Sequence, residues 1–528
     1  MRKFLAIITL ISVWALAQNV HASDQKRMIY GETARLNNLD PYTIHDASAY
    51  RLTDLIFDDL VTVGPGGSYQ PALAESWRVE DGGAAITVKL RKNVFWHPQG
   101  DDPIKPLSVD DVVTTIRLLT NKDSEIPNSE RFKVFAKTDV ISKSVIKIHY
   151  KRALADPIKP LLIKILPDHI LGKEDRLERK HPFNRSPVGT GPYIFSKTNP
   201  QGELLLKANH RHYNGKPHLE QIIMKPFSDQ TIMAQSLLFR SLDLITYLSP
   251  KDLKEVEGDR RMQLVPYEAQ SFSFIAMNTV KDPLKDKRVR QAISYAVNRA
   301  EMLEAFFGNK GHLITGPFSP SSWAYNLDVA GYKYDIDRAS SLISSAGYQS
   351  INSNGVVTNN SQRKLVLRFA VPIAGESEMI KRISLAIQSY LANIGVITQL
   401  EFLDWEVWKQ KVLGSQDYDM TIASWNFDDA ANISSLFHSS SAKPWGNNFV
   451  GYKNTTVDSL LIEAEATNDF DKRRAIYKKL HSVLADEAPY VFLWTLQHHA
   501  AHHQRLTGVR IEPFSFFKHV NSWNIKEI

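Results

Sequence analysis

The sequence predicts an α/β fold with more than one domain, and three patterns in the 528-residue chain support this. Residues 86–90 and 145–150 alternate between apolar and polar side chains, as half-buried strands do. Residues 379–394 carry apolar side chains every three to four positions, the period of an amphipathic helix, and residues 396–403 then have the composition of a strand. Because a helix followed by a strand is typical of α/β domains, we expect this class, with the part before about residue 225 richer in strands.

Two further helices are predicted in the second half of the chain. Apolar residues recur at helical spacing from Val289 to Phe307, and Gly308 can end such a helix in a left-handed conformation. Residues 469–485 form another amphipathic pattern, which Pro489 follows. The next residues, 490–495, resemble a buried strand.

The order of these elements indicates how the domains connect. The sequence after residue 495 is too short for a domain of its own, so we expect it to return to the first domain. The chain would then cross between domains twice, near 270 and near 489. We find no internal repeat and no low-complexity linker, so the domains are expected to fold closely together.

The N-terminal residues have the features of a secretory signal peptide. Arg2 and Lys3 precede an apolar run at 4–17, and the small residues Val20 and Ala22 come just before Ser23. The run of 14 residues is shorter than the ~20 needed to span a bilayer. We therefore expect a 22-residue leader, a mature chain that starts at Ser23, and a soluble product.

Composition narrows the compartment and the partners. The chain has no Cys, which excludes disulfides, thiolate catalysis, thiolate metal sites and a lipid-modified N-terminal Cys. An exported protein without an anchor is expected in the periplasm of a double-membraned bacterium. The net charge of +7, or +5 without Arg2 and Lys3, is spread among acidic residues with no basic tract, so nucleic acid is not an expected partner.

Motifs for enzymes are missing from the sequence. We find no phosphate-binding glycine loop, no dinucleotide fingerprint, no nucleophile elbow and no H-E-x-x-H zinc motif. Three carboxylate pairs could serve in acid–base chemistry, although adjacent acids are more often found on exposed turns or at helix starts. These pairs are Asp58–Asp59, Asp110–Asp111 and Asp428–Asp429.

Two other clusters have both a functional and a structural interpretation. His498, His499, His502 and His503 would form two i,i+4 pairs on a helix and could bind a divalent metal, but they follow a strand-like run and lack a nearby third ligand, so a structural or solvated role is favoured. A second cluster could line an aromatic pocket or simply fill a core. It comprises Trp405, Trp408, Trp425 and Trp445.

Several blocks, taken in order, resemble one family, the extracellular solute-binding proteins of peptide, dipeptide and nickel transporters. The blocks lie at 39–41, 71–77, 89–97, 107–113, 188–193, 286–296 and 339–348, and read LDP, PALAESW, KLRKNVFWH, LSVDDVV, VGTGPY, DKRVRQAISYA and ASSLISSAGY. The resemblance implies a two-lobed periplasmic binding protein fold of type II, with two hinge strands. Lobe I would comprise 23–270 and 490–528 with an inserted subdomain at about 60–186, and lobe II would comprise 271–489.

The resemblance also implies a function without catalysis, cofactor or metal. Members of the family capture a small solute in a closing cleft and deliver it to an inner-membrane ABC permease, and we expect a monomer. Peptide ligands pair through their backbone with strand edges. The alternative ligands are an oligosaccharide, an opine or a chelated metal, and a less favoured alternative is a periplasmic hydrolase that uses a carboxylate pair.

Specific residues follow from the family's Gly-Trp-x-x-Asp pattern, whose Asp binds the ammonium group of the peptide. The matching positions here are Trp425 to Asp428, which makes Asp428 the expected ammonium partner and the backbone of Trp425, Asn426 and Phe427 the expected pairing edge. The opposite edge is expected after the LDP block, around residues Asp46, Ala47 and Ser48.

The sequence departs from the family's pattern at four places. Ser424 replaces the Gly, and Ala430–Ala431 replace an acid–Pro pair, which puts the ligand class in doubt. Dipeptide-binding members resemble one another in an Arg-Pro-Tyr motif whose Arg binds the ligand carboxylate, but residues 371–376 read VPIAGE here, so longer peptides or another solute are favoured. Asn298 replaces an Asp before Arg299, a change that we interpret as structural.

Overall fold

The computed structural model contains two compact units, and the chain passes between them twice. It describes residues 26–44, 47–64, 67–127, 129–351, 355–373, 378–426, 433–467, 469–512 and 515–526. Unit 1 comprises Met1–Tyr267 and His498–Ile528, and unit 2 comprises Glu268–Gln497. Both transitions fall inside strands, β12 (Met262–Met277) and β19 (Tyr490–His503). The sequence suggested crossings near 270 and 489, and the second transition lies later, between Gln497 and His498.

The predicted signal peptide lies outside the described residues. The leader and Ser23 lie before residue 26, so their interpretation rests on sequence alone. Within the described ranges, we find no helix that combines the length and the apolar character needed to cross a membrane.

Unit 1 contains two principal sheets. The first has the strand order β19–β11–β1–β10–β9–β8, with β1 parallel to both of its neighbours. The second is antiparallel, has the order β4–β5–β7–β6, and lies within the range 60–186 where an inserted subdomain was predicted. The strands are β1 (Arg27–Glu32), β2 (Val61–Val63), β3 (Tyr69–Pro71), β4 (Ala74–Glu80), β5 (Ala85–Leu90), β6 (Phe135–Ser142), β7 (Val145–Tyr150), β8 (Tyr193–Thr198), β9 (Leu204–Ala208), β10 (Gln221–Pro226), β11 (Leu244–Ile245), β20 (Leu506–Thr507) and β21 (Asn524–Ile525).

Helices cover these sheets in unit 1. They are α2 (Ala47–Ile56), α3 (Val109–Thr120), α4 (Asp168–Leu171), α5 (Gln230–Leu238) and α6 (Pro250–Gly258).

The two glycines of the VGTGPY block pack against the last residue of α2, Ile56. A Cβ on Gly189 would lie 1.9 Å from the carbonyl oxygen of Ile56, and the amide of Gly191 donates to that same oxygen at 2.8 Å. Only glycine permits this close backbone approach.

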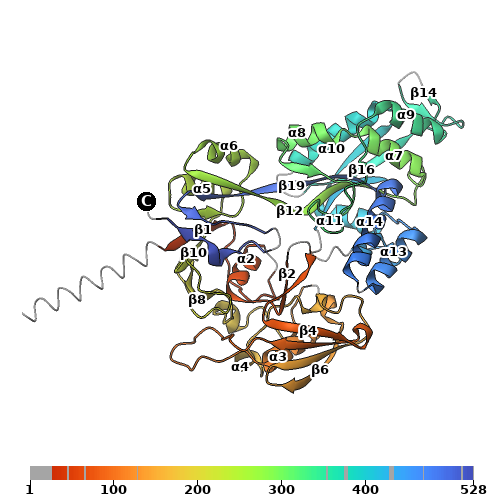
Figure 1. Ribbon diagram of the computed structural model, residues 1–528. Helices are drawn as coiled ribbons and strands as arrows, with labels where there is room; N and C mark the ends of the chain where they lie inside the picture. Colours follow the sequence, from red (N-terminus) through yellow and green to blue (C-terminus); the bar gives the residue numbers. More distant parts are fainter. Residues whose placement is uncertain are drawn as a thin grey trace, which may run out of the picture. The chain divides into compact units, whose positions relative to one another are not determined.

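Unit 2 is an α/β unit, as predicted, and helices cover both faces of its sheet. Its sheet has the order β17–β16–β18–β12–β19, in which β16 is parallel to β17 and β18, and β12 is antiparallel to β18. Figure 1 shows α7 to α10 on one side of the strands β12 and β16 and α11, α13 and α14 on the other. The elements are α7 (Lys287–Ala296), α8 (Arg299–Phe307), β13 (Gly311–Leu313), α9 (Ile336–Ser345), β14 (Ser350–Ile351), β15 (Val357–Thr358), β16 (Val366–Ile373), α10 (Glu378–Ala392), β17 (Ile397–Asp404), α11 (Trp405–Lys409), β18 (Met420–Asn426), α12 (Ser434–Phe437), α13 (Thr455–Ala466) and α14 (Phe470–Glu487).

Both faces of this sheet are buried, as the side chains of β12 demonstrate. Ile275 and Met277 belong to the core beneath α7 to α10, whereas Phe272, Phe274 and Ala276 belong to the core beneath α13 and α14. Since successive side chains of a strand point to opposite faces, burial on both faces gives an almost continuous apolar run.

One predicted helix is two helices. The continuous helix expected from Val289 to Phe307 is wrong, because α7 ends at Ala296 and α8 begins at Arg299. Asn298 separates them, and its side chain accepts a hydrogen bond from the amide of Glu301 at 3.2 Å, as an N-cap does. The structural interpretation of Asn298 agrees with this, and Gly308 ends α8 with a φ of 57°.

Candidate functional site

The carboxyl ends of three parallel strands meet at one edge of the unit 2 sheet. β16 ends at Ile373, β17 at Asp404 and β18 at Asn426, and Ile373 pairs directly with Asp404. Open α/β sheets bind their ligands at the carboxyl ends of parallel strands, because the loops there are free to diverge in sequence. This edge, defined by these three residues, is the candidate site in unit 2, and we call it the carboxyl edge.

Two of the predicted site residues lie at the carboxyl edge. Asn426 is exposed and pairs with Ser271 of β12, while the preceding Trp425 pairs with Phe272. The Trp425 ring is stacked with that of Phe274 at 6.3 Å, and its Nε1 donates to the Tyr490 hydroxyl at 3.4 Å. Trp425 is thereby fixed by the core, whereas the chain beyond Asn426 leads to Phe427 and Asp428.

Phe427 and Asp428 themselves lie outside the described residues, as does Asp429. Their binding role therefore stays a prediction. The position of Asn426 is relevant to it, because a chain leaving the carboxyl end of β18 starts from the edge at which a ligand is expected.

The four tryptophans singled out in the sequence divide between core and surface. Trp408 is buried, with its Nε1 donating to the Thr421 hydroxyl at 2.8 Å. Trp405 is 47% exposed, directly follows Asp404 at the carboxyl edge, and stacks on Trp408. Trp445 is 56% exposed and lies 3.1 Å from the place that a Cβ of Gly414 would occupy. Only Trp405 and Trp425 lie next to the candidate site.

A carboxylate that the sequence analysis missed lies on β12 near the same edge. Glu268 comes three residues before Ser271, the partner of Asn426, and so extends past the end of β18. The hydroxyl of Ser321 donates to Glu268 Oε2 at 2.7 Å, and Ser319 donates to the same oxygen. A lone acid within a long strand has no distinguishing sequence signal, so only the strand pairing reveals its position.

In unit 1 the stretch predicted as the opposite pairing edge is helical. Asp46 lies outside the described residues, whereas Ala47 and Ser48 form the first turn of α2. Ala47 and Ser48 therefore form no strand edge, because helical backbone does not present the extended row of donors and acceptors that pairs with a peptide strand. The binding role of these residues remains a prediction.

Ser48 instead contacts a buried carboxylate. Its hydroxyl donates to Glu32 Oε2 at 2.9 Å, and Arg51, one turn later, donates to both oxygens of Glu32 at 2.7 Å. Glu32 is the last residue of β1 and is only 1% exposed. The two-point contact with Arg51 ties α2 to the end of β1 in unit 1.

The histidine cluster lies on strand β19 rather than on a helix. His498 is in contact with the rings of Tyr247 and Tyr267, with centroids 5.0 and 5.5 Å away, and burial lowers its pKa. His502 Nδ1 donates to the carbonyl oxygen of His503, 3.0 Å away. Across the described part of the chain we find no group of three or more His, Cys, Asp or Glu arranged to hold a metal.

Three of the four acids in the unit 1 carboxylate pairs have structural partners. Asp111 accepts from the amide of Ser108 at 2.8 Å in a capping box of α3. Asp58 accepts a hydrogen bond from the Thr190 hydroxyl at 2.9 Å. Burial raises the pKa of its neighbour Asp59, whereas the positive charge of Lys164, 3.5 Å away, lowers it. These acids are held by caps and ion pairs, which is the ordinary role of adjacent carboxylates.

Comparison with known proteins agrees with this architecture. Residues 68–447 match the family described as bacterial extracellular solute-binding proteins, family 5 Middle. The chain is 26% identical to the oligopeptide-binding protein AppA of Bacillus subtilis over 93% of its length and 90% of that relative's. It is also 26% identical to the heme-binding protein A of Haemophilus influenzae, over 89% of this chain and 87% of the relative. Among solved structures, HbpA2 of Haemophilus parasuis has the same fold, with a TM-score of 0.84 at 21% identity. The match covers 95% of this chain and 100% of HbpA2.

Proposed function

Because the chain belongs to the bacterial extracellular solute-binding proteins of family 5, we propose that it is a periplasmic receptor that captures oligopeptides and delivers them to an inner-membrane ABC permease. The observation that carries the peptide part is the end of β18 at the carboxyl edge, where Trp425 and Asn426 lead into Phe427 and Asp428. A carboxylate leaving that edge supplies the counter-charge for a peptide ammonium group. The relative named as an oligopeptide-binding protein supports the same ligand class.

Ligand length follows from the end of β16, which lies at the same edge. The strand finishes with Pro372 and Ile373, and the residues to 376 include no Arg or Lys. A dipeptide carboxylate would find no fixed cation in this segment. The receptor therefore accepts peptides whose far end is not clamped, and their backbone supplies most of the contacts.

A second ligand class is favoured by Trp405. An exposed indole that stacks on a buried indole presents a flat apolar surface at the carboxyl edge, which suits a planar ligand or a sugar ring. The relative named as a heme-binding protein supports this alternative, which comprises oligosaccharide, opine and chelated-metal ligands. Such ligands lack an ammonium group for Asp428.

We propose no catalytic activity for the chain. Asp58, Asp59 and Asp111 are held by a hydrogen bond, an ion pair and a helix cap, which leaves these two pairs poorly suited to acid–base work. Of the third pair, Asp428 is assigned to ligand binding instead.

The deciding experiment is a pull-down of ligands with the mature protein. The protein is incubated with a mixed peptide pool, desalted and analysed by mass spectrometry under denaturing conditions. Recovery of intact peptides of several lengths supports the proposal. Recovery of a non-peptide solute in their place would transfer the proposal to the second ligand class, and recovery of peptide fragments would contradict the absence of catalysis.

A further inference from the structure

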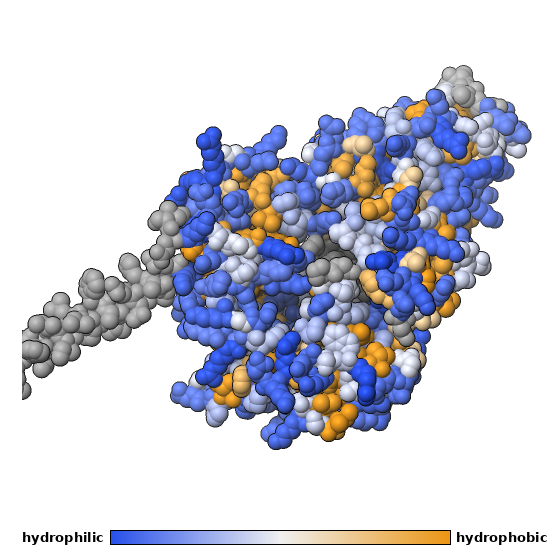
Figure 2. All heavy atoms as spheres, in the orientation of Figure 1, coloured by the Kyte–Doolittle hydropathy of each residue, from blue (hydrophilic) through white to orange (hydrophobic). Residues whose placement is uncertain are grey.

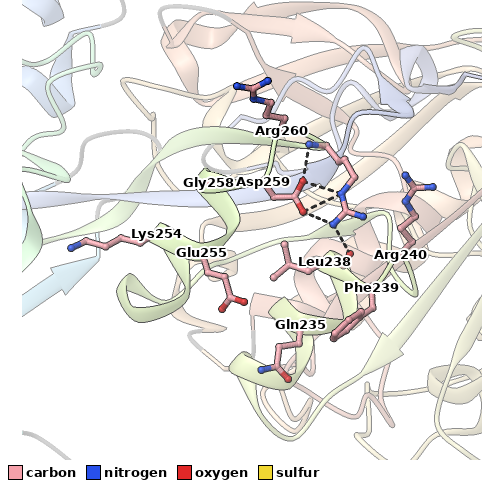
Figure 3. Close-up of a pocket in the computed structure, with 10 residues that line it drawn as sticks. Gln235, Leu238, Phe239, Arg240, Lys254, Glu255, Gly258, Asp259 and Arg260 are labelled. Atoms are coloured by element: carbon pink, nitrogen blue, oxygen red, sulfur yellow. Dashed lines mark hydrogen bonds and ion pairs between the residues drawn. The ribbon is translucent and has the colours of Figure 1, made fainter.

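A large open hollow beside α5 and α6 in unit 1 is not a built binding site. Figure 2 shows hydrophobic side chains among hydrophilic ones over the region that Figure 1 labels α5 and α6. The volume of the hollow is about 1090 Å³, and the residues that line it are all exposed or half-buried (Figure 3). Among them, Arg261 pairs with Asp259 and donates to the carbonyl of Leu238 at 3.3 Å. Since none of the lining residues is buried, the hollow gives a ligand only ordinary surface contacts.

Glu268, next to the carboxyl edge of unit 2, is held in place by neutral donors. The hydroxyls of Ser319 and Ser321 both donate to its Oε2, the second at 2.7 Å. The amide of Ser321 in turn donates to the Ser319 hydroxyl at 3.3 Å. Because Ser319 is only 8% exposed, this donor is fixed by the packing around it. Two hydroxyl groups orient the carboxylate, but they do not neutralise its negative charge.

The charge of Glu268 has no cationic partner in the described part of the chain, and its Oε1 accepts no hydrogen bond there. Other carboxylates of unit 2 differ, since Arg368 lies 2.8 Å from Asp417 and Lys411 lies 2.6 Å from Glu401. A brace between Glu268 and the serines does not need a charge, because a neutral amide oxygen would accept the same hydrogen bonds. The carboxylate therefore leaves one oxygen and one negative charge available to a ligand.

Strand pairing places Glu268 beside the path that an extended ligand would follow. β12 pairs with β18 as far as Ser271, the partner of Asn426, and the preceding residues of β12 lie past the end of β18. At about 3.4 Å per residue, Glu268 lies roughly 10 Å beyond that last pair. The hydroxyl of Thr495 donates to the carbonyls of Ala269 and Ser271, which holds this part of β12 in place. A peptide that continues the line of β18 would therefore bring one of its side chains next to Glu268.

The alternation of side chains along β12 places Glu268 on the same face of the sheet as Phe272 and Phe274. Trp425, the tryptophan at the candidate site, stacks with Phe274 and so belongs to this face as well. A second negative charge lies at the same edge, because Asp404 at the end of β17 is exposed and has no ion pair among the described residues. The edge therefore attracts a cationic group, and Glu268 gives that group a fixed acceptor.

We propose that Glu268 selects ligands with a basic side chain, so that the receptor prefers oligopeptides that contain Lys or Arg to neutral ones. This inference rests on the proposed function, because it assigns one subsite to the peptide that the receptor captures. The ammonium or guanidinium group donates to Oε1 of Glu268, while Ser319 and Ser321 retain Oε2. Because the serines already orient the carboxylate, the contact costs little conformational entropy on the side of the protein.

The test compares lysine with norleucine, whose side chain has the same four carbons without the ammonium group. Five alanine pentapeptides carry Lys at one position each, and five matched peptides carry norleucine at that position. Calorimetry with the mature protein measures the affinity of each peptide. At one position we expect Lys to bind about tenfold more tightly than norleucine, the contribution of a hydrogen bond to a charged group. At the other positions the two residues should differ little.

Variants separate this contact from general charge attraction. Glu268→Gln retains the size of the side chain and an acceptor for both serines, so it should fold, and it should abolish the difference between Lys and norleucine. Ser319→Ala/Ser321→Ala retains the charge but removes the groups that orient it, so the difference should fall only in part. The control Glu304→Gln removes an exposed carboxylate from α8 in the same unit and should leave the difference unchanged.

Four results would overturn the selection by Glu268. These are the absence of any Lys advantage in wild type, an equal advantage at all five positions, an advantage that Glu268→Gln retains, and an equal loss in Glu304→Gln. The norleucine peptides distinguish this failure from that of the proposed function. If they bind wild type without a Lys advantage, peptide capture stands and the selection is wrong, whereas absence of binding by every peptide contradicts peptide capture itself and the selection with it.

Discussion

Trp405 lies flat on Trp408 at the end of β17, with ring centroids 5.0 Å apart and planes only 9° apart. Trp405 is 47% exposed and Trp408 is 4% exposed, so the two stacked indoles face different environments. The buried ring serves the fold, and the exposed ring is available to a ligand at the carboxyl edge.

Alanine substitutions should separate the two roles. Trp408→Ala should cost about 3–5 kcal/mol of the free energy of unfolding, because it leaves a cavity in the unit 2 core and breaks the bond to Thr421. Trp405→Ala should cost no more than about 1.5 kcal/mol, the contribution of an aromatic pair, yet weaken ligand binding. Urea unfolding and calorimetry measure the two quantities. Unchanged affinity in Trp405→Ala would remove Trp405 from the site.

The pH dependence of unit 2 should depend on His481. This fully buried side chain has its pKa lowered to about 4 by burial, opposed by its contact with Thr315. Since the folded pKa lies below the unfolded value of 6.5, the neutral ring favours folding above about pH 6.5, and this stability is lost as the pH falls toward 4. The loss should reach about 3 kcal/mol at the acid end.

Urea unfolding of His481→Asn and wild type at a series of pH values tests this. The difference in stability between the two should shrink as the pH falls from neutral, because only wild type must protonate the buried ring. His312→Asn, at an exposed position of the same unit, is the control and should follow wild type throughout. A constant difference between His481→Asn and wild type would show that the ring does not titrate in this range.

Export predicts a defined N-terminus. If the leader is removed as its small residues at Val20 and Ala22 suggest, protein purified from the periplasm should begin at Ser23. N-terminal sequencing provides the measurement. Retention of Met1 would contradict both the leader and the periplasmic location.

Ligand should change the distance between the two units. The family resemblance implies a ligand site shared by two lobes, and such a site makes all its contacts only in the closed state. We therefore expect ligand to favour closure by bending within β12 and β19, where the chain passes between units. Small-angle scattering should then give a smaller radius of gyration at saturating ligand than without it. An unchanged radius at saturation would contradict a shared cleft.

Much of the fold could be predicted because it depends on local patterns. The helix before Gly395 and the strand after it match α10 and β17 closely, since both patterns are long and regular. The sequence did not predict the break at Asn298 because the apolar spacing continues across it, and only the N-cap of the second helix marks it.

The candidate site was less predictable because it depends on strand pairing. Glu268 and Asn426 are 158 positions apart in the sequence, and only the register of β12 with β18 brings their strand ends together. Ala47 and Ser48 were assigned to an extended edge by resemblance, and their helical conformation follows from α2, whose apolar face packs into the unit 1 core.

Asp428 is the residue on which the peptide interpretation depends. A carboxylate buried with a peptide ammonium group forms a charge-assisted contact that water cannot replace in a closed cleft. Asp428→Ala should therefore weaken peptide binding by roughly 2–5 kcal/mol, the cost of removing one partner of a buried charge pair. Asp429→Ala is the matched control and should change affinity little if that neighbour faces solvent.

The same loss should follow from a change to the ligand. An N-acetylated peptide has no ammonium charge, so wild type should bind it about as weakly as Asp428→Ala binds the free peptide. Because the two changes remove the same interaction, their combination should cost much less than the sum of the separate losses. Calorimetry on the four combinations measures this coupling directly. If acetylation weakens binding equally in wild type and in Asp428→Ala, the carboxylate and the ammonium group do not interact, and the ligand enters the site in another way.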